Sequence, residues 1–200
     1  MTFTSYKSIA AVLQEFPLTY QERDFIPLQE FIPDESFRSR FQLVLAEGVV
    51  FNSEAAICET IIAPILWEIW RHYHKSFLLW SHQPLYWDEQ LSGVPDYLLA
   101  RRSPRGKVLL EPPYLMFVEA KRDDFEAGWG QCLAAMLAAQ KLNDDPERQI
   151  FGGVSNGKLW EFGALKAECF TKNARFFSLE PLEELMGAIH SLFSSCHQQL

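Results

Sequence analysis

Residues 114–131 read YLMFVEAKRDDFEAGWGQ and change character in the middle. The first half is an apolar run of the length of a buried strand, so we expect a strand over Tyr114–Lys121. Asp123 and Asp124 then stand where a helix would begin, because aspartate is a common N-cap residue. The helix is expected to run from Asp124 to about Leu142. The stretch therefore indicates a buried strand that leads directly into a helix, a unit typical of α/β folds.

Two charged residues, Glu119 and Lys121, stand at the end of this apolar strand. Alternate residues of a strand share a face, so both side chains are expected on the face of Leu115 and Phe117. A carboxylate and an ammonium group at the end of a segment built for burial suggest a site that is held on a rigid element.

The preceding strand-like segment, Gly93–Arg102, contains Asp96 directly after Pro95. If the two strands form a hairpin with the loop Ser103–Pro113, Asp96 lies opposite Glu119. Two like charges so placed repel each other unless a cation lies between them. Mg²⁺ takes oxygen ligands from one or two carboxylates plus waters, so it meets this need.

The first long helix offers a third carboxylate. This helix is expected over 52–73, with a kink at Pro64. Since each helical residue turns by about 100°, Glu54 falls on the apolar face of the helix. Glu54 is therefore expected to look inward from the first turn.

The remaining segments complete an α/β pattern. Asn156-Gly157 lies between two apolar runs and predicts a tight hairpin. Other strands are expected near Ser76–His82, Gln149–Ser155, Lys158–Phe162 and Cys169–Leu179, and other helices over Ser5–Phe16, Phe37–Leu45 and Pro181–Phe193. This order predicts an α/β domain over residues 52–200 with a central mixed sheet flanked by helices. Residues 1–51 are expected to form a helical elaboration packed on it.

Composition limits the function classes. With 200 residues, 48% of them hydrophobic, the chain is large enough for one globular core. The net charge of −8 excludes a polycation that coats nucleic acid, although a bound cation leaves a nuclease open. The four cysteines form no CxxC pair, so no zinc site is indicated. The chain lacks both a signal-peptide pattern and an apolar run near the roughly 18 residues of a membrane span, so we expect a cytoplasmic protein without a membrane partner.

Pro95-Asp96, followed by Glu119-Ala120-Lys121 at the end of the next strand, resembles the PD-(D/E)XK nuclease superfamily. More closely, the stretches SEAAICETIIAPIL, GVPDYLLARRSP and YLMFVEAKRDDFEAGWGQ are similar to stand-alone members related to the N-terminal nuclease domain of type I restriction enzymes. The resemblance covers about residues 52–165. It implies a restriction-endonuclease-like fold and metal-dependent hydrolysis of phosphodiester bonds in DNA.

The resemblance also implies a role for each matched residue. Asp96 and Glu119 would bind Mg²⁺ or Mn²⁺, and Glu54 would assist them as a third carboxylate at the metal. Lys121 would help to position the attacking water and stabilise developing charge. A subset of the family has a glutamine on the next helix with a tyrosine four residues later. Gln131 matches the glutamine, but the residue four positions later is alanine.

Four basic residues lie close together in and after the Gly93–Arg102 strand. We expect them beside the acidic pair, where they would either contact DNA phosphates or form a solvated hairpin tip. They are Arg101, Arg102, Arg105 and Lys107.

Two other hypotheses stay open. A protein with the same fold but without catalysis would act as an interaction or nucleic-acid-binding module, and its metal affinity would separate it from a nuclease. An enzyme of another class on a different α/β fold would not bring Asp96 close to Glu119. The sequence also leaves open whether the chain acts alone, as a homodimer or in a larger assembly.

Overall fold

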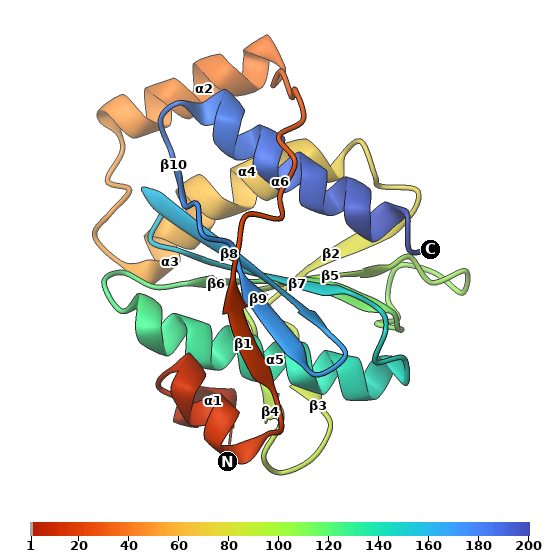
Figure 1. Ribbon diagram of the computed structural model, residues 1–200. Helices are drawn as coiled ribbons and strands as arrows, with labels where there is room; N and C mark the ends of the chain where they lie inside the picture. The colour runs from red at the N-terminus through yellow and green to blue at the C-terminus, as the bar shows by residue number, and fades with distance from the viewer. Residues whose placement is uncertain (1) are drawn as a thin grey trace.

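The computed structural model describes residues 2–200 and confirms an α/β protein in which a central eight-stranded mixed sheet packs against helices (Figure 1). The sheet contains β1 (Thr19–Glu22), β2 (Phe77–Ser81), β5 (Tyr97–Arg101), β6 (Tyr114–Ala120), β7 (Ile150–Ser155), β8 (Leu159–Lys166), β9 (Cys169–Lys172) and β10 (Phe177–Ser178). Their order is β1-β9-β8-β7-β6-β5-β2, and β10 pairs with β8. The β6–β7 and β1–β9 pairs are parallel and the others antiparallel. Two short strands, β3 (Leu85–Tyr86) and β4 (Ser92–Gly93), pair separately.

Helices cover both faces of the sheet. They are η1 (Phe3–Ser5), α1 (Ile9–Glu15), α2 (Glu35–Glu47), α3 (Glu54–Ile57), η2 (Cys58–Ile62), α4 (Ala63–Trp70), α5 (Phe125–Asn143) and α6 (Leu182–His197). Figure 1 shows α1 and α5 on one face and α3, α4 and α6 on the other, with α2 outermost. Each face encloses its own apolar core, and Trp129 and Phe193 are fully buried members of the two cores. Within the described part of the chain, no helix combines the length and the apolarity that a bilayer crossing requires.

The long helix expected over 52–73 is present as α3, η2 and α4, but it is not α-helical throughout. Ser53 caps it, since its hydroxyl accepts the Ala56 N–H at 3.1 Å. The segment Cys58–Ile62 is a wider π-helical turn that ends two residues before Pro64. Proline has no N–H for an α-helical bond, and a local change of helix type absorbs that loss.

The β5–β6 hairpin contains a bulge that the sequence did not indicate. The register slips between Leu99 and Ala100, which leaves Leu115 as an extra residue in β6. The expectation that Leu115 shares a face with Phe117 is therefore wrong. Leu115 lies in the core under α4 and α6, whereas Phe117 lies in the core under α5.

The first 51 residues contribute to the sheet as well as to the helices. β1 pairs with β9 and forms one edge of the sheet, so this segment is not only a helical elaboration. α1 begins at Ile9 rather than at Ser5, because Ser8 is its N-cap and accepts the Ala11 N–H at 3.1 Å. The strand expected over Cys169–Leu179 is divided into β9 and β10.

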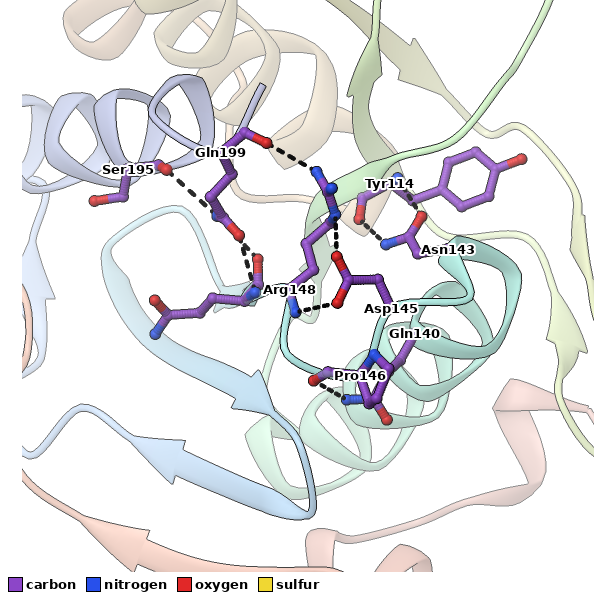
Figure 2. A network of polar contacts seen from close by, with 9 residues as sticks. Tyr114, Gln140, Asn143, Asp145, Pro146, Arg148, Ser195 and Gln199 are labelled. Atoms are coloured by element: carbon purple, nitrogen blue, oxygen red, sulfur yellow. Dashed lines mark hydrogen bonds and ion pairs between the residues drawn. The ribbon is translucent and has the colours of Figure 1, made fainter.

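Polar side chains tie the C-terminal ends of α5 and α6 to the starts of β6 and β7 (Figure 2). Asn143 brackets the backbone of Tyr114, accepting its N–H at 2.8 Å and donating to its carbonyl at 2.9 Å. Gln199 brackets Gln149 in the same way, at 2.9 and 3.1 Å. This network anchors the sheet at the end opposite to the one at which β6 terminates.

Candidate functional site

A row of three polar residues crosses the ends of β2, β5 and β6. Tyr97, the first residue of β5, pairs with the residue before Glu119, so one step outward places Asp96 opposite Glu119. Tyr97 also pairs with the residue before His82, so the same step places His82 opposite Asp96. The expected juxtaposition of Asp96 and Glu119 is therefore present, and His82 extends the row beyond it.

Asp96 is held by the backbone on both sides. Its Oδ2 accepts the Ala120 N–H at 2.7 Å, and its carbonyl oxygen accepts the His82 N–H at 2.9 Å. Its Oδ1 lies 3.4 Å from His82 Nε2. The Asp96 carboxylate is thus fixed at the sheet edge, where its side chain remains 21% exposed.

Glu119 is the penultimate residue of β6 and is only 4% exposed. Burial raises the pKa of the Glu119 carboxyl well above its usual range, and the neighbouring Asp96 charge raises it further. Lys121 opposes this shift of the Glu119 pKa, but it does not cancel it. The two carboxyl groups therefore carry an electrostatic penalty that a positive ion between them would relieve.

Lys121 follows β6 but is still held as part of the sheet. Its N–H donates to the Ser155 carbonyl at 2.8 Å, which continues the β6–β7 pairing by one residue. Its side chain is only 15% exposed. The Lys121 ammonium is consequently presented at the site from a largely buried stem.

Glu54 approaches the same place from α3. Its Oε2 lies 3.9 Å from Lys121 Nζ, and its Oε1 accepts the Arg122 N–H at 3.3 Å. The Glu54 side chain is 51% exposed, so it faces the rim of the site rather than the core. The expectation that Glu54 looks inward is therefore wrong, because its carboxylate lies at the rim beside Lys121.

Gly128 on α5 provides the surface on which the Lys121 stem lies. A Cβ at this position would come within 2.8 Å of Lys121 Cγ and 2.6 Å of Val154 Cγ1. We expect Gly128→Ala to destabilise the protein by about 1–3 kcal/mol through overpacking, although alanine is otherwise the better helix former. Chemical denaturation of the two proteins measures this difference.

Lys121→Ala supplies the matched background for this test. Removing the lysine stem relieves one of the two close contacts, so Gly128→Ala should cost less in the Lys121→Ala protein. An equal cost of Gly128→Ala in both backgrounds would show that the Lys121 stem does not rest on Gly128.

Within residues 2–200, no hydrogen bond or ion pair joins the other predicted residues to this row. Gln131 is partly exposed on α5 and makes no side-chain hydrogen bond with the rest of the described chain. The four basic residues Arg101, Arg102, Arg105 and Lys107 begin at the opposite end of β5 from Asp96. At about 3.3 Å per residue, Asp96 and Arg101 are separated by roughly 17 Å along the strand. The expectation that this basic group lies beside the acidic pair is therefore wrong.

Two of the basic residues are also engaged with protein groups. Arg105 Nη1 lies 3.1 Å from Glu111 Oε1, and Arg102 Nη1 donates to the His74 carbonyl at 3.3 Å. All four side chains are nevertheless exposed. Any contact that they make with DNA would lie away from the acidic pair.

His82 is the residue at this site that the sequence did not reveal. The strand ending near His82 was expected, but its partner was not assigned. The pairing of Tyr97 with the residue before His82 is the signal that identifies it, and this pairing becomes visible only once β2 is placed beside β5.

The donor set fits a hard divalent cation held by two carboxylates. Mg²⁺ commonly uses one or two protein carboxylates and keeps several waters. Asp96 and Glu119 provide such a pair, and the raised pKa of Glu119 is the physical cost that the cation would offset. Among residues 2–200, no group of three or more histidine, cysteine, aspartate or glutamate side chains is arranged to hold a metal ion. Glu54 is therefore not grouped with the pair as a third direct ligand.

No protein-family model matches the chain, and a search of curated proteins found no match to it.

Proposed function

We propose that the protein is a metal-dependent nuclease that hydrolyses phosphodiester bonds in DNA. The observation that carries this proposal is the pairing of the buried Glu119 with the partly buried Asp96, with Lys121 directly after Glu119 and Ala120 at the end of β6. Such an arrangement is costly without a cation, because it confronts two carboxyl groups in a place shielded from water. The resemblance to the PD-(D/E)XK superfamily supports it as a separate line of reasoning from the sequence.

Asp96 and Glu119 are the residues that would hold Mg²⁺ or Mn²⁺. When bound, such an ion lowers the pKa of a coordinated water and neutralises charge on a phosphate. The Ala120 N–H fixes Oδ2 of Asp96, which leaves Oδ1, 3.4 Å from His82 Nε2, as the oxygen that would bind the ion. Glu119 is fixed by burial in the end of the sheet. The pair is thus oriented before a ligand arrives, which is what efficient catalysis requires.

Lys121 would donate hydrogen bonds to a phosphate oxygen or to the attacking water. An ammonium held in a largely buried position stabilises developing negative charge more strongly than one in bulk water. Glu54 lies 3.9 Å from this ammonium and would hold it toward the pair. Glu54 therefore acts, in this proposal, as a residue that positions Lys121.

The basic residues of the β5–β6 loop enter the proposal only as distant contacts. A nucleic acid whose scissile phosphate lies at Asp96 and Glu119 would meet Arg101, Arg102, Arg105 or Lys107 several phosphates away. These residues would contribute to affinity and its salt dependence rather than to chemistry.

Cleavage assays with the wild-type protein test the proposal. Labelled single-stranded, duplex and branched DNA are incubated with Mg²⁺, with Mn²⁺ or with EDTA, and the products are separated on denaturing gels. We expect cleavage of at least one DNA form with either metal and none in EDTA. If no DNA is cleaved and the protein does not bind Mn²⁺, the nuclease proposal fails. DNA binding without cleavage would then favour the module that lacks catalysis.

A further inference from the structure

His82 occupies a backbone conformation that histidine seldom adopts. Its φ is 51°, in the left-handed region that a non-glycine residue enters at a cost. Such outliers persist where the surrounding structure holds them in place, and they are often part of functional sites. The backbone conformation at His82 is therefore expected to be held in place by specific contacts.

His82 makes such contacts with its neighbours. Its N–H donates to the Asp96 carbonyl at 2.9 Å, which extends the β2–β5 pairing by one step. Its Nδ1 lies 2.8 Å from the Ser81 hydroxyl, and its Nε2 lies 3.4 Å from Asp96 Oδ1. The ring also packs against Tyr97, with the ring centroids 6.2 Å apart. The imidazole is thus fixed on three sides with one nitrogen directed at Asp96.

We propose that His82 is a positioning residue, which holds Oδ1 of Asp96 in the orientation that binds the metal ion. Asp96 has two oxygens: Oδ2 is fixed by the Ala120 N–H, and Oδ1 faces His82 Nε2. With a proton on Nε2, the imidazole donates toward Oδ1, while Nδ1 accepts the Ser81 hydroxyl. The inference rests on the proposed metal site and adds a residue to it.

A residue that hydrogen-bonds to a metal ligand changes the metal affinity without binding the metal itself. Hydrogen-bonding partners of ligating carboxylates and histidines commonly change metal affinity by about 10–100-fold when they are replaced. His82 is 58% exposed and directly follows the edge strand β2, so its replacement removes little buried surface. The expected effect therefore lies in metal binding rather than in folding.

Two substitutions separate the two nitrogens of His82. His82→Asn retains a polar group near the Nδ1 position, loses the one that reaches Asp96, and tolerates the left-handed backbone. His82→Gln retains an N–H group near the Nε2 position. His74→Asn is the control, because His74 is an exposed histidine whose Nδ1 contacts the Arg71 carbonyl.

The measurement is the dissociation constant for Mn²⁺, from electron paramagnetic resonance of the free ion, with thermal unfolding in EDTA as a check of folding. We expect His82→Asn to bind Mn²⁺ about 10–100-fold more weakly. His82→Gln should stay within about threefold of wild type, and His74→Asn should match wild type.

Three results would overturn the inference. Unchanged Mn²⁺ affinity in His82→Asn would show that His82 does not orient Asp96. A loss in His82→Gln as large as that in His82→Asn would show that the imidazole acts in another way, for example as a direct ligand. Absence of Mn²⁺ binding by the wild-type protein would remove the metal site itself, and with it both the proposed function and the role of His82.

Discussion

Replacing Lys121 by methionine is expected to lower metal-dependent cleavage of DNA by about a hundredfold or more. Methionine keeps an unbranched apolar stem on Gly128 but removes the ammonium that lies beside Glu54 and acts on the Glu119 carboxyl. The largest effect should fall on kcat, because the missing charge stabilises the transition state more than the bound DNA. Single-turnover cleavage rates at saturating Mn²⁺ measure this effect.

Mn²⁺ affinity distinguishes this role of Lys121 from a structural one. Loss of a positive charge favours binding of another cation, whereas loss of the lysine also favours protonation of Glu119. These effects oppose each other, so the dissociation constant for Mn²⁺ should change by only a few fold. Lys75→Met is the matched control, because Lys75 is an exposed lysine outside the site. Cleavage by Lys121→Met at the rate of wild type would remove Lys121 from the proposed mechanism.

The juxtaposition of Asp96 and Glu119 could be predicted because it depends on local rules. The two strands follow each other in the chain, joined by the 12-residue loop 102–113, and consecutive strands commonly pair as a hairpin. Placing the centre of the pairing at the centre of that loop puts Asp96 opposite Glu119. The bulge at Leu115 lies between the loop and the pair, and the register at Tyr97 nevertheless places Asp96 opposite Glu119. A slip of one residue at the strand ends would have separated the two carboxylates.

The contribution of His82 could not be predicted in the same way. Fifteen residues separate β2 from β5, and they contain the small β3–β4 pair. A connection of this length does not determine a register from sequence alone. The parallel pairing of β1 with β9 could not be predicted for the same reason. It joins segments almost 150 residues apart and is determined by tertiary packing.

The wrong expectation for the four basic residues has a different cause. Residue alternation assigns Arg101 and Asp96 to faces of β5, but proximity in sequence is not proximity in space along an extended strand. Five residues of strand carry Arg101 to the other end of the sheet. Nearness in the sequence predicts nearness in space for a helix or a tight turn, but not for a strand.

Replacing Glu119 by glutamine is expected to stabilise the metal-free protein at alkaline pH while it abolishes the metal site. In the wild type, the folded-state pKa of Glu119 is raised, so folding favours its protonated form. The resulting penalty is absent below the usual carboxyl pKa, grows as the pH rises, and is complete above the raised pKa. Glutamine carries no charge at any pH. The variant should therefore exceed the wild type by about 1–2 kcal/mol in free energy of unfolding near pH 9 and by much less near pH 5.

Added metal should reverse this order of stability. Mn²⁺ at about 100 times its dissociation constant would stabilise the wild-type protein by about 2.7 kcal/mol, and the variant would gain none of it. Chemical denaturation at a series of pH values, with EDTA or with Mn²⁺, measures both effects.

Glu59→Gln is the control, since Glu59 is an exposed glutamate on η2 and the stability of this variant should follow that of the wild type in every condition. If the difference between Glu119→Gln and wild type does not vary with pH, Glu119 is not the buried, perturbed carboxyl described above. If Mn²⁺ stabilises both proteins equally, the ion binds elsewhere. The alkaline penalty and the response to Mn²⁺ must disappear together, because both are attributed to the same carboxylate facing Asp96.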